Sequence, residues 1–458
     1  MEIEDIFYNK RELFDSGHTK SYDFRIHQLE ELKSAIKNNE EEIFEALYKD
    51  LHKARFESYA AEIGFIYQEL NYVIKNLKYW MRPKRVRGII STFPSKSYIY
   101  AEPLGVVLIV SPWNYPFQLV MAPLIGAIAA GNCAIVKPSN QSINTSLVIK
   151  KIIKEAFTDD YISLVEGAGS SVVPQLIQAY SFDHIFFTGS PKVGKEIMSL
   201  ASNHLTPVTL ELGGKSPAIV DKDANIDLAT RRIVSGKFYN TGQTCIAPDY
   251  LLVDRDVREE LIENLIKYIK DFYGENPKES EDYGRIINNK RFTKLVDYLK
   301  DGDIVFGGDN DIQELYIGPT LIDCKDTNKA IMKEEIFGPI LPIISYKEIG
   351  EVVDIIRQNR HPLALYLFTN NKNVEKYILE RIEFGGGSIN NSLLHLLNPK
   401  MPFGGVGTSG MGRYHGKYSF DTFSHYKSIL KSSNKLDLLL RYPPYDNKKL
   451  DLIKKIMK

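Results

Sequence analysis

Cysteines are the most reactive side chains of this sequence, and there are three of them: Cys133, Cys245 and Cys324. Their number is odd and they lack the close pairs of a zinc site, so we expect no metal site and a reducing compartment, the cytoplasm. Cys133 and Cys324 fit the ordinary role of a lone cysteine, a small buried hydrophobe. Cys245 follows Gly242-Gln243-Thr244, and this glycine-rich approach favours an accessible, nucleophilic thiol.

Two polar residues lie at the ends of expected strands, Asn114 after the first and Glu211 within the end of the fifth. Asn114 lies in the segment 112–116, Pro-Trp-Asn-Tyr-Pro, and Glu211 begins the segment 211–217, Glu-Leu-Gly-Gly-Lys-Ser-Pro. A third polar segment, Glu-Ile-Phe-Gly-Pro over 335–339, follows ninety residues after Cys245. Each has a plainer interpretation when taken alone: Glu211 as a cap or ion-pair partner, and Asn114 as a turn residue. Their combination makes a nucleophile with an acid–base partner conceivable.

Residues 186–196 indicate a phosphate-binding turn. The dinucleotide fingerprint Gly-x-Gly-x-x-Gly is absent, and the segment instead predicts a strand, a turn at Gly189 and a helix containing Gly194. It also nearly matches a P-loop. However, Glu196 occupies the position that needs Ser or Thr for Mg²⁺, which argues against an NTPase. A helix N-terminus with Ser190 as a donor still suits a pyrophosphate, but a plain strand-to-helix turn would have the same sequence pattern.

Alternating strands and helices must position these groups. The expected strands are 105–110, 133–137, 162–166, 184–187 and 208–212, and the expected helices are 117–130, 145–157, 172–178 and 192–202. This alternation predicts a parallel sheet with helices on both faces. A second alternating region runs from 216 to about 412. Lys137-Pro138-Ser139 closes one strand, at the edge where open α/β sheets bind ligands.

Together these segments resemble the aldehyde dehydrogenase superfamily over nearly the whole chain, because they recur in the order and at the spacing of that family. The class 3 branch is the most similar, on residues 242–250, 362–366 and 402–416 and the tail 441–445. The resemblance implies an α/β fold. It would contain a Rossmann-like parallel-sheet cofactor domain, an α/β catalytic domain and a small bridging β-hairpin for oligomerisation.

The same resemblance implies NAD- or NADP-dependent oxidation of an aldehyde to a carboxylic acid. Cys245 would attack the aldehyde to form a thiohemiacetal, which becomes a thioester after hydride transfer. The Asn114 amide and the Cys245 backbone N–H would donate to the negative oxygen. Glu211 would activate the water that hydrolyses the thioester. Glu335 would hold the nicotinamide ribose.

Further cofactor and substrate contacts follow from the resemblance. Phe337 and Phe403 would pack near the nicotinamide ring, although both also suit core packing. The remaining matched positions are Lys137, Ser139, Gly189, Ser190 and Gly194 for the cofactor and Tyr115 and Asn390 for the substrate. With Leu119, Leu393 and Leu394, Tyr115 would line an apolar tunnel for medium- or long-chain aliphatic, aromatic or polyene aldehydes, but ordinary packing explains these side chains almost as well.

One position departs from the family. The family usually follows Lys-Pro-Ser with Glu, which binds the adenine ribose hydroxyls, whereas this chain has Asn140. A neutral amide still bonds to the ribose and no longer repels a 2′-phosphate. We therefore expect use of NADP⁺ within about tenfold of NAD⁺.

Composition restricts the partners. Lys plus Arg and Asp plus Glu both number 58, so no net charge favours nucleic acid or an anionic membrane. Residues 118–136 are apolar enough to suggest a membrane span, but Pro123, Asn132 and many small residues favour a buried helix and strand. The tail 448–458 mixes leucines and isoleucines with lysines. It fits an amphipathic or disordered segment better than a lipid contact.

A chain of 458 residues predicts two or three domains. We expect a cofactor-binding domain (1–84 and 105–209), a catalytic domain (210–416), a bridging and oligomerisation segment (85–104 and 417–431) and a C-terminal tail (432–458). A strand over 420–430 would lie at an interface and need a partner, and the resemblance makes this partner a second subunit in a homodimer.

Two rival functions stay open. A CoA-acylating aldehyde dehydrogenase passes the acyl group to a thiol, and Glu211 argues against it because that reaction needs no water-activating carboxylate. A catalytically inactive binding relative should have lost Cys245, Glu211 or Asn114, yet all three are present.

Overall fold

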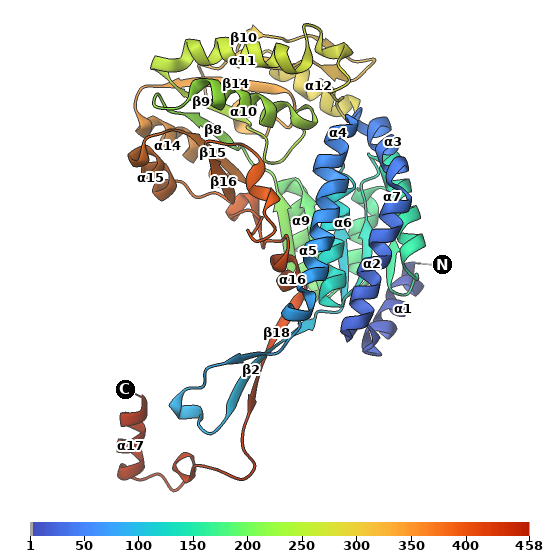
Figure 1. Cartoon of the computed structure of the whole chain (residues 1–458), viewed down its shortest axis with the longest axis vertical. Helices are drawn as coiled ribbons and strands as arrows, with labels where there is room; N and C mark the ends of the chain where they lie inside the picture. The colour runs from blue at the N-terminus through green and yellow to red at the C-terminus, as the bar shows by residue number, and fades with distance from the viewer. Residues whose placement is uncertain (1–2, 458) are drawn as a thin grey trace.

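The computed structural model describes residues 3–457 and contains two large sheets and a smaller three-stranded one (Figure 1). The first large sheet has the order β17-β7-β6-β3-β4-β5. Its strands are β3 (Val106–Val110), β4 (Cys133–Lys137), β5 (Ile162–Leu164), β6 (His184–Gly189), β7 (Val208–Leu212) and β17 (Gly410–Met411). Only β17 runs antiparallel to its neighbour. The five strands expected from the sequence are therefore confirmed, with β5 two residues shorter than expected.

Helices cover both faces of this sheet, as the buried strands require. Those between its strands are α6 (Gln118–Ala130), α7 (Ile143–Ala156), α8 (Gly169–Ala179) and α9 (Pro191–Ala201). The N-terminal layer adds α1 (Ile3–Asp15), α2 (Tyr22–Asn38), α3 (Glu40–Leu51), α4 (Arg55–Ser58), a π-helical turn, η2 (Tyr59–Ile63), and α5 (Gly64–Trp80). Every residue of α6 is buried. No helix within residues 3–457 is long and apolar enough to span a membrane.

The second sheet has the order β10-β13-β14-β9-β8-β15-β16. Its strands are β8 (Pro217–Val220), β9 (Tyr250–Asp254), β10 (Asp303–Phe306), β13 (Thr320–Asp323), β14 (Ile340–Tyr346), β15 (Ala364–Phe368) and β16 (Gly386–Ile389). Around it lie α10 (Ile226–Phe238), α11 (Arg258–Tyr273), α12 (Asn289–Tyr298), α13 (Ala330–Lys333), α14 (Ile349–Gln358) and α15 (Lys372–Arg381), with a small ladder of β11 (Asn310–Asp311) and β12 (Tyr316–Ile317). Alternate residues of β8 and β9 enter two different hydrophobic clusters, one on each face of the sheet.

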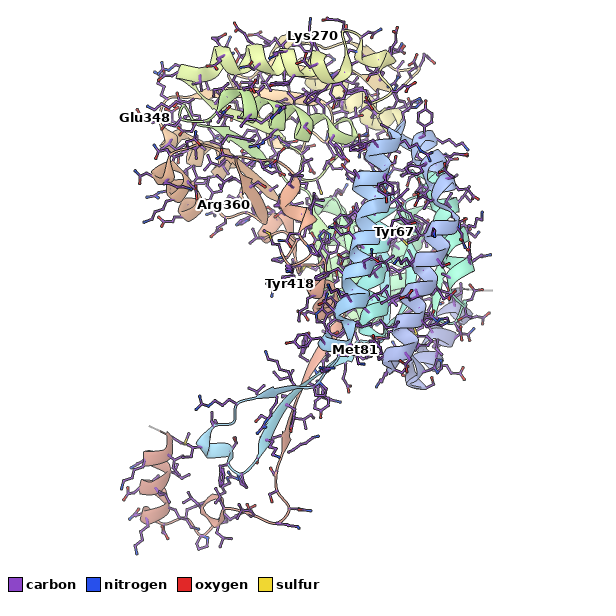
Figure 2. The ribbon with its side chains drawn as sticks, viewed as in Figure 1. Tyr67, Met81, Lys270, Glu348, Arg360 and Tyr418 are labelled. Atoms are coloured by element: carbon purple, nitrogen blue, oxygen red, sulfur yellow. The ribbon has the colours of Figure 1, made fainter. Side chains whose placement is uncertain are left out.

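A narrow arm projects from the body (Figures 1 and 2). It begins near Met81 and contains β1 (Lys84–Val86), β2 (Lys96–Pro103) and β18 (Ser424–Lys431) as an antiparallel sheet. Beyond β18 the chain ends in α17 (Asn447–Met457), whose leucines at 450 and 452 are half exposed. The extended hairpin expected before residue 103 is thus present, and β18 adds a third strand to it.

The expectation of one strand over 420–430 was wrong at its start. Residues 417–422 form α16 (Lys417–Thr422), and the strand begins only at Ser424. Phe420 and Phe423 are buried in the core of the first sheet, because α16 packs against α6 at Gly126, where a Cβ would lie 2.6 Å from the Ser419 Cβ. Three-residue spacing on a short helix explains these aromatic residues, so 417–422 packs on the body and only β18 joins the arm.

Candidate active site

A cavity of about 1600 Å³ lies between the two large sheets. Its walls come from segments that follow β3, β6 and β7 and from the loop before β9. These are carboxyl ends of parallel strands together with the facing loops of the second sheet, where open α/β folds bind ligands. Of the site residues predicted from the sequence, twelve line this cavity: Asn114, Tyr115, Leu119, Gly189, Ser190, Glu211, Cys245, Glu335, Phe337, Leu393, Leu394 and Phe403.

A tight loop presents Cys245 to the cavity. Asn240 and Thr241 have left-handed φ angles of 52° and 54° and are buried, a backbone state that persists only where the surroundings impose it. The Gln243 side chain helps to impose it, since Nε2 donates to the Arg285 carbonyl (2.9 Å) and Oε1 accepts from the Ile287 N–H (3.1 Å). Cys245 is partly exposed, while Cys133 and Cys324 are buried. The structure therefore leaves only Cys245 accessible among the three thiols.

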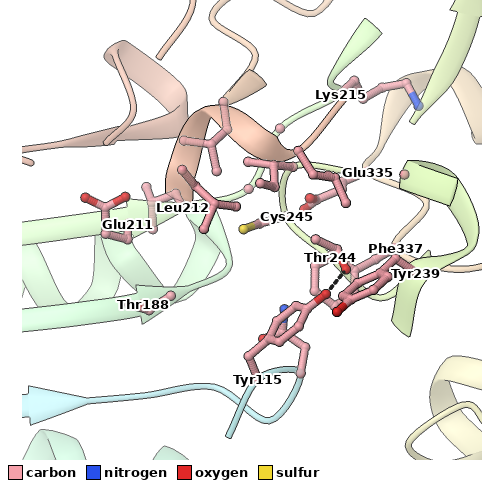
Figure 3. Close-up of a pocket in the computed structure, with 18 of the residues that line it drawn as sticks. Tyr115, Thr188, Glu211, Leu212, Lys215, Tyr239, Thr244, Cys245, Glu335 and Phe337 are labelled. Atoms are coloured by element: carbon pink, nitrogen blue, oxygen red, sulfur yellow. Dashed lines mark hydrogen bonds between the residues drawn. The ribbon is translucent and has the colours of Figure 1, made fainter. Parts of the chain in front are cut away.

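Asn114 lies against this loop and is 2% exposed. Its side-chain Nδ2 donates to the Gln243 backbone carbonyl at 3.1 Å, and the Asn114 backbone carbonyl accepts from the Asn240 side chain at 2.8 Å. A side-chain amide carries two N–H hydrogens, so one hydrogen stays free for a ligand oxygen near Cys245. The neighbouring Tyr115 hydroxyl is 2.6 Å from the Thr244 hydroxyl (Figure 3).

Two carboxyl groups flank the thiol. In Figure 3 the Cys245 sulfur lies between the side chains of Glu211 and Glu335. Both oxygens of Glu211 are buried without a hydrogen-bond partner in the described part of the chain, and burial raises the pKa of this carboxyl well above 4.5. Burial and the negative charge of Asp249 raise the pKa of Glu335 to about 8. Burial, together with these two carboxylates, also raises the pKa of the Cys245 thiol. The site therefore favours the protonated form of all three groups and needs a ligand or a base to release the thiolate.

The turn after β6 offers a helix N-terminus to the cavity. Gly189 and Ser190 line the cavity, and Ser190 caps α9 by accepting from the Val193 N–H at 3.4 Å. Gly194 lies one turn further in, outside the lining, where a Cβ would come 2.8 Å from the Leu212 side chain. Its role in the structure is close packing of α9 on β7.

Lys137, Ser139 and Asn140 lie at the end of β4, outside the cavity lining. Lys137 is 2% exposed and its Nζ donates to the Pro138 carbonyl at 2.6 Å; burial lowers the pKa of this amine. The Ser139 hydroxyl accepts from the Gln141 N–H at 3.1 Å, and Asn140 is exposed. These residues share the carboxyl edge of the first sheet with Gly189 but form a separate part of it.

The loop that carries Glu335 and Phe337 is held by buried cations. Lys215 pairs with Asp249 at 2.5 Å and also donates to the carbonyls of residues 331 and 334. Asp249 accepts in turn from the Ile336 N–H at 3.0 Å. Arg291 donates to the carbonyls of residues 336 and 337, and its guanidinium lies 5.8 Å from the Phe337 ring centroid. None of these three supporting roles was expected from the sequence, although Lys215 lies in the Glu211 segment.

Aromatic rings close the cavity. Phe337 packs edge-on against Trp113, with centroids 5.4 Å apart. Phe403 stacks on His415 at 5.2 Å and pairs through its backbone with Tyr414. His415 also lines the cavity, and burial lowers the pKa of this imidazole to about 3, so it stays neutral.

The predicted substrate contacts separate into two groups. Tyr115, Leu119, Leu393 and Leu394 line the cavity. Asn390 does not: its positive φ of 56° turns the amide toward Thr369, where it exchanges two hydrogen bonds of 2.9 and 2.8 Å with the backbone. The next two residues, Asn391 and Ser392, reach the cavity instead.

Known proteins are similar to this chain in sequence and in architecture. The family model described as "Aldehyde dehydrogenase family" matches residues 2–429. A 4,4'-diaponeurosporen-aldehyde dehydrogenase of Staphylococcus aureus (strain NCTC 8325) is 51% identical over 448 residues, which is 97% of each chain. A dimeric, NADP-preferring aldehyde dehydrogenase of Canis lupus familiaris is 43% identical over 97% of this chain and 98% of its own. A solved structure of Staphylococcus aureus AldH, described as a substrate-bound state, has a TM-score of 0.98 at 50% identity, with 100% of both chains covered. This chain belongs to the aldehyde dehydrogenase family.

Proposed function

We propose that this enzyme oxidises an apolar aldehyde to the carboxylic acid through a thioester on Cys245, with NAD⁺ or NADP⁺ as the oxidant. The observation that carries the proposal is the shared cavity of an accessible thiol and a buried, unpartnered carboxyl group, Glu211. A nucleophile beside an acid–base group of raised pKa is what acyl chemistry near neutral pH requires.

The first step is attack of the Cys245 sulfur on the aldehyde carbon. The thiol proton passes to solvent, a C–S bond forms as the carbonyl π bond breaks, and the carbonyl oxygen becomes negative. The second N–H of Asn114, together with the Cys245 backbone N–H, donates to this oxygen. Such donors stabilise the transition state because they are already oriented and shielded from water.

Glu211 acts in the second half of the reaction. Once the thioester has formed, the carboxylate takes a proton from water, whose oxygen attacks the acyl carbon and releases the acid and the Cys245 thiol. Its raised pKa suits this role, since a carboxylate of higher pKa is a stronger base toward water. The balance is aldehyde, water and NAD(P)⁺ giving acid, NAD(P)H and a proton.

Several groups fit a dinucleotide. Glu335 Oε1 is buried without a partner in the described part of the chain, which suits a ribose hydroxyl, and the turn at Gly189 and Ser190 suits a pyrophosphate. Phe337 and Phe403 would pack near the nicotinamide, and Lys137, Ser139 and Asn140 would take the adenosine end. The bound nicotinamide supplies hydride acceptance. We propose NADP⁺ use within about tenfold of NAD⁺, and the name of the canine relative, NADP-preferring, supports this.

A long apolar aldehyde is the substrate class that we favour. The cavity lining includes a set of large apolar side chains: Phe65, Tyr115, Leu119, Leu393, Leu394, Leu396 and Leu397. The Staphylococcus relative is named for 4,4'-diaponeurosporen-aldehyde, which agrees with such a lining. Asn390 serves this lining indirectly, by placing Asn391 and Ser392.

A series of saturated aldehydes from acetaldehyde to hexadecanal tests the proposal with purified enzyme. We expect NADH formation, the free acid as product and a kcat/KM that rises with chain length. A steep preference for acetaldehyde would refute the apolar tunnel, and no turnover with any aldehyde would favour an inactive binding relative. Adding CoA separates the remaining rival, because acyl-CoA in place of free acid would indicate an acylating enzyme.

A homodimer in the cytoplasm completes the proposal, with the four-part domain division expected from the sequence, except that residues 417–422 belong to the body. Residues 84–103 and 424–458 hold 13 basic and 4 acidic side chains, so this arm carries +9 and the rest of the neutral chain −9. A second copy offers the complementary charge to each arm, and the canine relative is named as dimeric. Sedimentation at low and high salt tests this: a dimer that weakens as salt rises supports it, and a monomer at all salt concentrations contradicts it.

A further inference from the structure

A buried ion pair lies behind the loop that carries Asn114. Lys53, between α3 and α4, pairs with Glu62 of the π-helical turn η2, and both side chains have 0% exposure. Neither residue lines the cavity. Burial of two charges costs free energy unless further hydrogen bonds satisfy them. The other contacts of Lys53 and Glu62 therefore indicate what the pair does.

The other hydrogen bonds of these two side chains in the described part of the chain, and the ring contact of Lys53, all involve residues within the segment 114–118. Glu62 Oε2 accepts from the N–H groups of Phe117 (2.9 Å) and Gln118 (3.2 Å), at the start of α6, where the helix dipole also favours a negative charge. Lys53 Nζ donates to the Asn114 carbonyl at 3.2 Å and lies 4.3 Å from the Tyr115 ring centroid. The pair therefore holds residues 114–118 from outside the cavity lining.

The cysteine loop provides a second anchor for Asn114. Asn240 donates to the Asn114 carbonyl, and Asn114 donates to the Gln243 carbonyl. The Asn114 carbonyl thus accepts from one residue of each anchor, Lys53 and Asn240. Residues 112–117 have no helix or strand of their own to fix them, so these two anchors set where the amide points.

We propose that Lys53 and Glu62 are a positioning pair, which fixes the Asn114 amide at the place where the attacked oxygen becomes negative. The proposal rests on the role given to Asn114 above. Displacement of a catalytic group by about 1 Å can cost 100-fold in rate, so loss of the Lys53 anchor should affect kcat more than substrate binding.

The test compares Lys53→Met and Glu62→Gln with a matched control, Lys10→Met. Lys10 is another lysine with 0% exposure; it donates to the Asp159 carbonyl and to Ser163, away from the cavity. We expect Lys53→Met to lower kcat about 10- to 100-fold with the aldehyde KM changed less than about threefold. Lys10→Met should lose thermal stability but keep kcat within about twofold. Glu62→Gln keeps an acceptor for the N–H groups at the start of α6. Its kcat tests the proposal if Lys53→Met does not fold.

Two further readouts separate positioning from general loosening. In an Asn114→Ala background, Lys53→Met should cause no additional loss of kcat, because a residue that acts through Asn114 has nothing left to position. The rate of Cys245 alkylation by iodoacetamide should stay within about twofold of wild type, since that reaction forms no oxyanion.

Losses of kcat that multiply in the double variant, a slowed alkylation, or an unchanged kcat in both Lys53→Met and Glu62→Gln would each overturn the proposal. Failure of the underlying function gives a different result. In that case Asn114→Ala itself would keep the wild-type kcat.

Discussion

Replacement of Asn114 by alanine is the perturbation whose effect follows most directly from the geometry. The amide is 2% exposed, and one of its two N–H hydrogens already bonds to the Gln243 carbonyl. The proposed function gives the other hydrogen to the substrate oxygen. Loss of one oriented donor from such a site lowers kcat by about 100- to 1000-fold, or about 2.7–4 kcal/mol in the barrier. The aldehyde KM should change little, because the oxygen gains its charge only after attack.

The assay is steady-state NADH formation with a long-chain aldehyde, together with thermal unfolding of the same preparation. Asn114→Ala also removes the bond to Gln243, which should cost about 1 kcal/mol of stability. Asn132→Ala is the matched control: Asn132 is fully buried and bonds to the backbone of Gly105, just before β3, and of Phe423, at the end of α16, so this variant should lose stability without losing kcat. If Asn114→Ala folds and loses less than about threefold in kcat, the oxyanion assignment is wrong.

Three further predictions concern other parts of the site. Glu211→Gln should lower kcat about 100-fold or more through slow thioester hydrolysis. Glu211→Gln should also be more stable than wild type above pH 5. The pKa of the Glu211 carboxyl is raised in the folded state, so the unfolded wild-type chain releases this proton first as the pH rises past 4.5. The free energy of unfolding of the wild type then falls by at most about 1.4 kcal/mol per pH unit. Unfolding curves at pH 4 and pH 8 should show the gain only at pH 8. Asn140→Glu should lower kcat/KM for NADP⁺ about tenfold or more relative to NAD⁺, by repulsion of the 2′-phosphate; equal losses for both cofactors would contradict this. Lys215→Met should raise the cofactor KM about tenfold and destabilise the fold by about 3–5 kcal/mol, because Asp249 is left buried and unpaired; an unchanged cofactor KM would refute this role for Lys215.

The parallel sheet was predictable because its strands are apolar on both faces. The run 133–137 is buried at every position in the structure, as a continuous apolar strand between turn residues suggests. Residues 417–422 were not predictable in the same way. Phe420 and Phe423 fit the spacing of a short helix, yet alternation through residue 430 looked like one longer strand, and only packing on Gly126 decides between them.

The chemistry of the site was predictable because its residues belong to short contiguous motifs. The residues that position them were not predictable. Cys245, Glu211 and Asn114 belong to recognisable motifs, whereas Glu62 lies in a helical segment where charges usually face water, and Lys53 lies in the loop before it. One signal was available: Glu62 is in phase with the buried Ile66 and Leu70 at four-residue steps. A carboxylate on a buried stripe implies a partner, but only the fold brings Lys53 and residues 114–118 to it.

Asn390 is a residue that the sequence predicted as a substrate contact and that does not reach the cavity. The sequence places it next to residues that do reach the cavity, but a left-handed backbone turns its amide to Thr369. Sequence spacing fixes which loop approaches a site; the backbone angles within the loop decide which side chain enters it.

Direct detection of the acyl-enzyme tests the central claim most sharply. Glu211→Gln protein is mixed with a long-chain aldehyde and NAD⁺, quenched in acid and digested for mass spectrometry. The expected result is one acyl group on the peptide that contains Cys245, formed together with one NADH per site, and neither product with Cys245→Ala. An acyl group on another residue, or NADH production by Cys245→Ala at the wild-type rate, would contradict thioester catalysis at Cys245.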